Sequence, residues 1–384
     1  MFFQQSLATT AKSAVPIIAP AAMPDLGVSA AYAGVYVSLA AVGQVLSTMG
    51  CGSFIRRYGG LRISQVGLIM VLVGLACGAT GFLWPFVLTA FLVSAGTSVA
   101  TPASSQILAR YSPPRYAPLV FSAKQTAVPF GLMLLGVMMP FFVVQFGWQG
   151  ALLALGGICA GFALMLQPVR AELDRDRDPT QRLSPRDFTS TFRSVVTTPS
   201  LRRLAVAMFA FVGLQSTYTT YFVLYLTEGL GYSLTEAGGI FAAATMLGMP
   251  ARLLWGYVAS GWLSAQYVLA GLGVLMAAAT AMTGFYTPEW THWQILGVAM
   301  VFTATGLGWH GVLLSEIARI APPGQVGTMT GGVLAFSGFG QIVLPLVFSG
   351  ILAAGGSYGL GFQVASVPPL LIGVMLALLG KVQD

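Results

Sequence analysis

Long apolar stretches alternate with short polar breaks along this chain, and that alternation predicts an all-helical protein that crosses a membrane many times. A transmembrane helix needs roughly 20 apolar residues to cross about 30 Å of hydrocarbon. The connections between the apolar stretches are short and rich in Gly, Pro and Ser. The predicted spans are 3–24, 29–54, 62–82, 84–109, 117–144, 148–168, 203–227, 233–259, 264–286, 292–319, 325–354 and 358–380, which makes twelve transmembrane helices.

One charged stretch, from Arg170 to Arg203, divides the apolar spans into two groups of six. It holds eight of the 18 Lys and Arg residues and five of the 11 Asp and Glu residues. We interpret it as a solvated cytoplasmic linker. The expected domains are an N-terminal six-helix bundle at 1–168, the charged linker at 169–202 and a C-terminal six-helix bundle at 203–384.

Composition supports a lipid environment and excludes several function classes. The chain is 56% hydrophobic and 8% charged, with a mean hydropathy of +0.80, whereas soluble domains carry about 25% charged residues. The net charge of +7 is not gathered in a basic patch, so we expect no nucleic-acid partner. No metal-ligand spacing, nucleotide loop or nucleophile motif is present. We therefore expect a monomer in the lipid bilayer that is not an enzyme and has no cofactor and no metal.

Basic residues occur in alternate connections between the predicted spans, and this bias predicts the orientation. Cytoplasmic connections carry the excess of Lys and Arg. Both termini and the central linker are therefore expected on the cytoplasmic side, and the short loops favour a bacterial inner (plasma) membrane. The cations that set this orientation, beside those of the linker, are Arg56, Arg57, Arg62, Arg110, Arg115, Arg319 and Lys381.

The two halves of the chain resemble each other. Asp25–Gly34 is similar to Gly229–Gly238, with Ser29 matching Ser233, and Ser105–Pro114 is similar to Ser315–Pro323. Because the order of the similar segments is preserved, the repeat is parallel. Parallel six-helix halves are related by an axis along the membrane normal, with a substrate site near the bilayer midplane.

A motif after the second span resembles the signature of the major facilitator superfamily, G-x-x-x-D-[RK]-x-G-[RK]-[RK]. The segment from Gly52 to Arg62 reads GSFIRRYGGLR, so Arg56 stands in the acid's place, and Ser260 stands there in the second-half copy. The resemblance implies a two-bundle transporter that works by alternating access. It also implies that the acid's usual contact at the cytoplasmic gate differs here. The residues to which it gives a gating role are Gly52, Arg56, Arg57 and Gly59.

Three ionisable side chains lie well inside predicted spans, at Lys12, Lys124 and Arg252, and two more, Glu316 and His310, lie toward a helix end. A Lys or Arg at the bilayer centre costs about 2.5–3.5 kcal/mol on insertion scales, so the three cations are candidate substrate-binding residues, and His310 is a further candidate. The alternatives are structural. The lysines can snorkel to the interface, Arg252 can pair with Glu316, and His310 can be a hydrogen-bonded core residue.

Three further candidates share one face of the seventh span, at Gln215, Tyr218 and Tyr221. They form either a cavity wall or an aromatic packing stripe, because buried tyrosine hydroxyls need polar partners. Gln341 is a weaker candidate in the eleventh span. Glu316 precedes Arg319 by one helical turn near the cytoplasmic interface, which predicts an ion pair or a gate contact.

An excess of positive charge within the spans predicts an anionic substrate. Lys12 in the first span and Arg252 in the eighth are similar to residues of monocarboxylate and oxalate–formate type porters within the superfamily. We therefore predict a secondary transporter of a small organic anion, a carboxylate, by proton symport or anion exchange. Efflux of drugs or other lipophilic compounds is the main alternative, and a non-transporting sensor or scaffold is the third.

Overall fold

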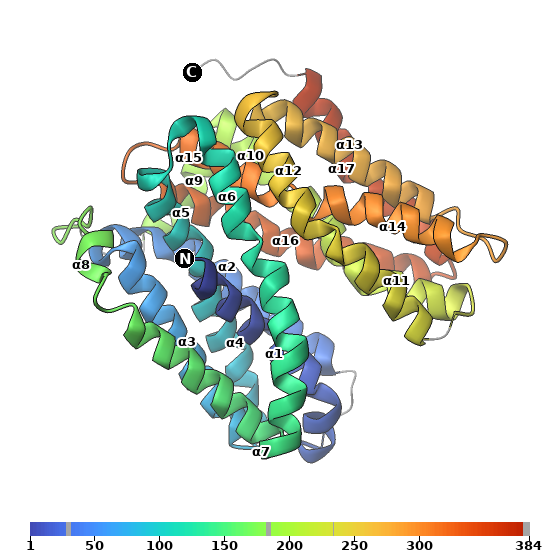
Figure 1. Ribbon diagram of the computed structural model, residues 1–384, viewed down its shortest axis with the longest axis horizontal. Coiled ribbons are helices and arrows are strands. Elements are labelled where there is room, and N and C mark those ends of the chain that lie inside the picture. The colour runs from blue at the N-terminus through green and yellow to red at the C-terminus, as the bar shows by residue number, and fades with distance from the viewer. Residues whose placement is uncertain (28–31, 182–185, 233, 379–384) are drawn as a thin grey trace. The chain divides into compact units, whose positions relative to one another are not determined.

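The computed structural model describes residues 1–27, 32–181, 186–232 and 234–378, and every regular element in these ranges is a helix (Figure 1). Ser29, Ser233 and Lys381, used above for the repeat and the orientation, lie outside the described residues. The elements of the first half are α1 (Phe2–Asp25), α2 (Tyr32–Tyr58), α3 (Gly60–Ala79), α4 (Leu83–Ser98), α5 (Ala100–Tyr111), η1 (Pro114–Tyr116), α6 (Ala117–Gln125), α7 (Ala127–Met165), α8 (Arg170–Leu173) and α9 (Arg186–Thr197). Those of the second half are α10 (Pro199–Leu224), η2 (Tyr225–Gly229), α11 (Leu234–Met246), α12 (Gly248–Gly261), α13 (Ala265–Thr283), α14 (His292–Gly306), α15 (His310–Ile320), α16 (Val326–Ala353) and α17 (Tyr358–Leu378).

The predicted spans coincide with these helices, but four of the spans are built from two helices that meet at an irregular turn. These pairs are α4 with α5, α6 with α7, α11 with α12, and α14 with α15. Within α7 the break falls at Gly147, which has a φ of 69°. A positive φ is readily adopted only by glycine. Gly147 therefore separates the predicted spans 117–144 and 148–168.

Length and apolarity together identify nine membrane-spanning stretches among the described residues, or ten if α10 is counted with the end of α9. The helices α1 and α2, with 24 and 27 residues, are long enough to cross a bilayer but are not among them. Both carry polar residues, such as Gln5 on α1 and Gln44 on α2, that line the pocket described below.

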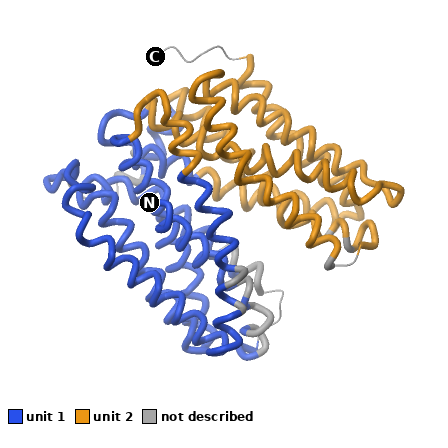
Figure 2. Tube along the Cα trace, in the orientation of Figure 1, with its two compact units in different colours: residues 1–111, 124–197, 321–335 blue, residues 112–123, 198–320, 336–384 orange. Residues whose placement is uncertain are grey.

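The chain forms two compact units (Figure 2). The first unit contains residues 1–111, 124–197 and 321–335, and the second unit contains 112–123, 198–320 and 336–384. Two segments, 112–123 and 321–335, therefore cluster with the half of the chain that does not contain them in sequence. The division into domains at 1–168, 169–202 and 203–384 stays a prediction.

The first unit is held together by an apolar core between α1, α3, α4 and α7. Val15, Leu68, Val93 and Leu152 are all at most 2% exposed in this core. Small residues bring the helices close together, since a Cβ at Gly67 would collide with the backbone of Gly96. Close approach of small residues is a usual source of helix packing in membranes.

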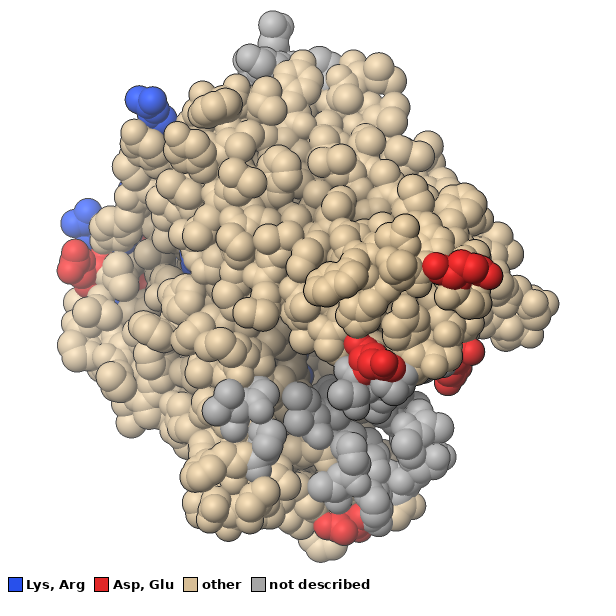
Figure 3. All heavy atoms as spheres, turned by 45° about the vertical axis from the view of Figure 1, so that its right-hand side comes forward, with Lys and Arg blue, Asp and Glu red and all other residues tan. Residues whose placement is uncertain are grey.

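The outer surface is apolar over large areas. Trp84, Val144 and Leu378 are each at least 80% exposed, and most of the face shown in Figure 3 carries neither acidic nor basic side chains. A surface of this kind is stable against lipid hydrocarbon rather than water. The structure is therefore that of an integral membrane protein, as predicted.

Candidate functional site

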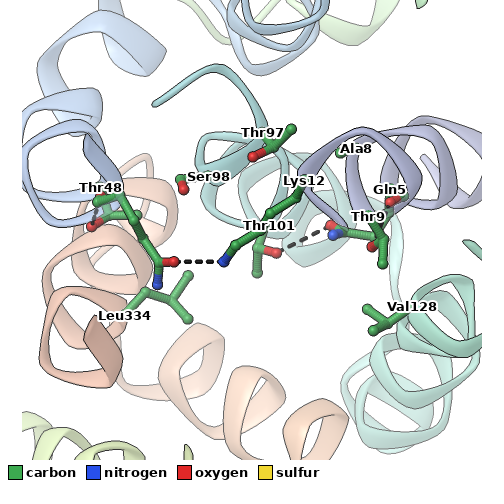
Figure 4. Close-up of a pocket in the computed structure, with 11 residues that line it drawn as sticks. Gln5, Ala8, Thr9, Lys12, Thr48, Thr97, Ser98, Thr101, Val128 and Leu334 are labelled. Carbon is green, nitrogen blue, oxygen red and sulfur yellow. Dashed lines mark hydrogen bonds between the residues drawn. The ribbon is translucent and has the colours of Figure 1, made fainter. Parts of the chain in front are cut away.

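A polar pocket of about 200 Å³ lies inside the first unit, with Lys12 extending into it (Figure 4). Its side chains come from α1, α2, the junction of α4 and α5, the start of α7 and the N-terminal part of α16. The lining residues are Gln5, Ala8, Thr9, Lys12, Gln44, Thr48, Thr97, Ser98, Thr101, Val128 and Leu334.

Helix α1 supplies the pocket with one polar face. Gln5, Thr9 and Lys12 are spaced by four and three residues, so they lie on the same side of the helix. The opposite side buries Ala11 and Ala14, each 0% exposed, in the apolar core. This division fixes the rotation of α1 and turns Lys12 toward the open space of the pocket.

The ammonium group of Lys12 has a neutral partner. Its Nζ donates a hydrogen bond to Gln44 Oε1 at 2.6 Å, so the amide holds the side chain in place without neutralising its charge. Thr48 follows one turn after Gln44 on α2, and its hydroxyl donates to the Gln44 carbonyl oxygen at 2.8 Å. Lys12 is therefore oriented by α2 through a partner that carries no charge of its own.

A second lysine joins the pocket through Gln5. Lys124 is 6% exposed, and its Nζ donates to Gln5 Oε1 at 2.8 Å and to Gln125 Oε1 at 3.3 Å. Thr101 also donates to Gln5 Oε1, at 3.1 Å. Because Lys124 lies in the last turn of α6, the helix dipole also stabilises its charge.

None of the described residues that line this pocket carries a carboxylate. Between residues 1 and 171 the sequence contains a single acid, Asp25, whose Oδ2 accepts a hydrogen bond from Trp148 Nε1 at 2.6 Å. Two lysines in a polar, acid-free environment produce a positive potential. The pocket is thus suited to an anion that can also accept hydrogen bonds from hydroxyl groups.

The second unit places Arg252 and His310 near each other. Arg252 on α12 is 3% exposed and lies close enough to His310 for their charges to interact. The His310 ring stacks on Trp309 with 3.7 Å between ring centroids, and its buried Nδ1 has no hydrogen-bond partner among the described residues. Glu316 forms its ion pair with Arg319, at 2.9 Å, as predicted for these two residues.

Of the side chains predicted to share one face of the seventh span, Gln215, Tyr218 and Tyr221, the two tyrosines pack against other residues of the second unit. Tyr218 is fully buried and stacks on Phe302 with 3.5 Å between ring centroids. The Tyr221 hydroxyl donates to the Pro345 carbonyl oxygen at 3.2 Å. Gln215 and Gln341 are half-buried. This arrangement favours packing for Tyr218, and substrate roles for all four residues stay predictions.

Several pocket residues are not anticipated by the sequence analysis, namely Gln5, Thr9, Thr97, Ser98 and Thr101. For Gln5 and Thr9 the sequence does contain a signal, because they form a polar stripe with Lys12 in an otherwise apolar span. Thr97, Ser98 and Thr101 flank Val99, where α4 gives way to α5, and nothing local in the sequence marks that junction.

The candidate gating glycine Gly52 and Gly256, which begins the second-half copy of the motif, make equivalent contacts in the two units. A Cβ at Gly52 on α2 would lie 2.5 Å from Thr328 on α16. A Cβ at Gly256 on α12 would lie 2.6 Å from Ser122 on α6. These contacts involve the two segments that cluster away from their own half of the sequence, so each glycine permits a close helix crossing there.

Most described residues of the charged segment between 170 and 181 are exposed, but Asp174 is an exception, and the interpretation as a linker stays a prediction. Asp174 is only 3% exposed, and its carboxylate accepts hydrogen bonds from the backbone N–H groups of Leu61 (2.7 Å) and Arg62 (3.0 Å). It thereby caps the N-terminus of α3. Burial raises the pKa of Asp174, against the effect of these two hydrogen bonds and of Arg170.

The basic residues of the signature motif hold the same segment. Arg57 Nη1 donates to the Gln181 carbonyl oxygen at 2.9 Å, and the Asp178 N–H donates to the Arg56 carbonyl oxygen at 2.7 Å. Arg110 forms an ion pair with Asp176 at 2.7 Å. These contacts hold the segment 176–181 against the end of α2 and the end of α5.

The fold and its polar interior define a polytopic helical membrane protein of the transporter class. The model of the Major Facilitator Superfamily matches residues 1–317, and the chain belongs to this superfamily. It is therefore a secondary transporter rather than an enzyme.

Similar proteins of known name include anion transporters. The gallate transporter of Pseudomonas putida is 24% identical and aligns over 86% of this chain and 83% of its own. The cis,cis-muconate transport protein of Acinetobacter baylyi is 23% identical over 93% and 87%. A probable nitrate/nitrite transporter of Mycobacterium tuberculosis, NarK2, is 27% identical over 84% and 80%.

Solved structures of low sequence identity share the fold. The human organic anion transporter MFSD10 superposes with a TM-score of 0.79 at 16% identity, over 98% of this chain and 97% of its own. The Escherichia coli fucose:proton symporter gives 0.75 at 14% identity, over 98% and 96%. The named relatives carry aromatic acids, dicarboxylates or nitrate, so they do not support the narrower likeness to monocarboxylate and oxalate–formate porters.

Proposed function

We propose that this transporter moves a small organic anion, a carboxylate, by alternating access. The observation that carries the proposal is the position of Lys12 in an acid-free pocket. Its ammonium group is oriented by Gln44 and surrounded by hydroxyl and amide groups. An ammonium donates charge-assisted hydrogen bonds to a carboxylate, and these are stronger than neutral ones.

Two sets of side chains would contact the substrate. Lys12 would hold the carboxylate, while Thr9, Thr97 and Thr101 would hydrogen-bond to further oxygen atoms of the ligand. The Lys124–Gln5 pair would add positive potential behind them. A ligand with several oxygen atoms, such as a hydroxylated aromatic acid or a dicarboxylate, uses these groups better than a simple alkyl carboxylate. The names of the gallate and muconate relatives agree with this choice.

The same features argue against export of lipophilic cations. Such a substrate requires a buried carboxylate, and the described residues that line the Lys12 pocket include none. Desolvating a cation beside Lys12 would cost free energy without compensation. In the second unit, Arg252 is a further cation and His310 is a cation or neutral. Neither residue supplies the carboxylate that a cationic substrate requires. Proton symport and anion exchange both remain compatible with these residues.

A ligand panel tests the proposal. The purified protein is melted in the presence of gallate, muconate, a short alkyl carboxylate, nitrate and a lipophilic cation, because a ligand that binds only the folded state raises Tm. We expect gallate or muconate to stabilise wild type, and Lys12→Gln to weaken that binding by about tenfold or more. Arg115→Gln, which removes the same charge from an exposed site, should bind like wild type. Stabilisation by the lipophilic cation alone would contradict the proposal.

A further inference from the structure

A second polar pocket lies in the first unit, at the end of α2 that carries the signature motif. It has a volume of about 100 Å³. Arg56 and Ser53 on α2, Thr191 and Ser194 on α9, and Thr328 on α16 contribute to its lining. The remaining lining residues are Gln181, Gln325 and Met329. The pocket is separate from the Lys12 pocket, and the two share no lining residue.

The chemistry of this lining is that of an oxyanion site. One guanidinium group and four hydroxyl groups surround the space, and none of the described lining residues carries a carboxylate. The nearby acid Asp178 interacts with Arg56 electrostatically, but its carboxylate accepts hydrogen bonds from the N–H and hydroxyl of Thr180. A guanidinium group matches the geometry of phosphate-type oxygens and donates to them in pairs.

Two further observations point to a ligand. The hydroxyl of Thr328 is buried and has no hydrogen-bond partner among the described residues, and a buried unsatisfied hydroxyl is unfavourable. Thr328 also lies in the first turn of α16, which begins at Val326. The N–H of Gly327 in this turn donates to Gln106 Oε1 at 2.9 Å, and the positive end of the helix dipole attracts an anion. The volume exceeds the share of one water molecule, about 30 Å³, and accommodates a tetrahedral oxyanion.

We propose that this pocket binds a phosphate group through Arg56 and the hydroxyls of Thr191, Ser194 and Thr328. The bound group joins α2, α9 and the first turn of α16. The close contacts between these helices support such a bridge, since a Cβ at Gly332 would lie 2.8 Å from both Thr191 and Val195. Phosphate would stabilise the packing of segment 321–335 on α2 and α9. It would therefore slow any transport step that requires these helices to separate.

The inference is independent of the transported substrate, because it concerns a different pocket and a different arginine. Arg56 replaces the acid of the superfamily motif. With an acid at position 56 the pocket would repel an oxyanion. Arginine at this position makes the pocket attract an oxyanion instead. The source of the phosphate group is either inorganic phosphate or the headgroup of an anionic lipid.

The test uses the full-length protein in nanodiscs of phosphatidylcholine, melted in phosphate-free buffer with increasing inorganic phosphate at constant ionic strength set by chloride. We expect a saturable rise in Tm. Arg56→Gln should weaken the apparent affinity by about tenfold and Thr328→Val by severalfold. Arg115→Gln, an equal loss of charge outside the pocket, and Lys12→Gln, in the other pocket, should both respond like wild type.

Nanodiscs containing phosphatidylglycerol in phosphate-free buffer identify the source. A rise in Tm that is lost in Arg56→Gln would show that the lipid headgroup supplies the phosphate. A rise only with inorganic phosphate would show that the free ion does. No saturable response to either, or equal responses of wild type and Arg56→Gln, would overturn the proposal. Equal binding of gallate by wild type and Lys12→Gln would overturn the proposed substrate site but leave this one unaffected.

Discussion

Gly59 and Asp174 are in direct contact, although 115 positions separate them in the sequence. Gly59 has a φ of 96° and a ψ of 152°, a backbone conformation that is essentially restricted to glycine. Its missing Cβ leaves the space that the Asp174 carboxylate occupies. The carboxylate can therefore reach the backbone N–H groups of Leu61 and Arg62. The second glycine of the signature motif thus anchors the segment that follows the sixth predicted span.

Replacing Gly59 with alanine should destabilise the protein for two reasons. The backbone conformation costs about 1–3 kcal/mol for a residue with a Cβ, and the new methyl group would displace Asp174. We expect a lower Tm in detergent for Gly59→Ala. The matched control is Gly271→Ala on α13, where a Cβ meets no atom within 4 Å, and which should leave Tm unchanged or slightly higher. Equal Tm values for wild type and Gly59→Ala would show that the contact does not constrain the fold.

Asp174 predicts a particular pH dependence. Burial raises its pKa in the folded protein, so the folded state binds the proton more tightly than the unfolded chain, in which Asp titrates near about 3.9. Acidification through the interval between these two values therefore favours the folded state. We expect the Tm of wild type relative to Asp174→Asn to rise between neutral and mildly acidic pH. A fall in this difference would mean that the two hydrogen bonds outweigh desolvation and lower the pKa.

The close helix crossing at Gly52 predicts that α2 tolerates a larger side chain at some positions but not at this one. Gly52→Ala would push a methyl group against Thr328, whereas a Cβ at Gly50, two residues earlier, meets no atom within 4 Å. We expect Gly52→Ala to lower Tm and the transport rate and Gly50→Ala to leave both near wild type. Thr328→Ala should partly restore Gly52→Ala, since residues in contact are energetically coupled. Equal behaviour of the two alanine variants would contradict a close crossing at Gly52.

Arg252 provides a test in the second unit. It is 3% exposed, and a buried guanidinium group gives planar donors suited to a carboxylate. We expect Arg252→Gln to weaken carboxylate binding by about tenfold or more, with Arg252→Lys intermediate. Arg115→Gln, which removes an exposed cation from the same unit, is the control. Unchanged binding by an Arg252→Gln protein that melts like wild type would assign Arg252 to structure alone.

Helix positions were accessible from the sequence because hydrophobic length is a local property. The predicted spans and the break at Gly147 both follow from local composition. The polar stripe of Gln5, Thr9 and Lys12 is also local and indicates which face of α1 lines the pocket. Tyr218 shows the limit, because a periodic aromatic stripe is the same in the sequence whether it lines a cavity or packs on Phe302.

Contacts between distant segments were not accessible in this way. The burial of Asp174 depends on Gly59, and the pocket around Arg56 depends on α2, α9 and α16 meeting in one unit. A charged stretch of sequence predicts solvation on average, but one residue in it is buried where a helix N-terminus offers two N–H groups. Such exceptions require the three-dimensional arrangement.

The most direct test of the central claim is uptake of a carboxylate into proteoliposomes by Lys12→Gln. The substrate is whichever of gallate and muconate stabilises wild type more, and Lys12→Arg and Arg115→Gln are measured alongside. We predict that Lys12→Gln lowers the uptake rate by about tenfold or more at subsaturating substrate, that Lys12→Arg retains part of it, and that Arg115→Gln equals wild type. Uptake by a well-folded Lys12→Gln protein at the wild-type rate would contradict the assignment of the Lys12 pocket as the anion site.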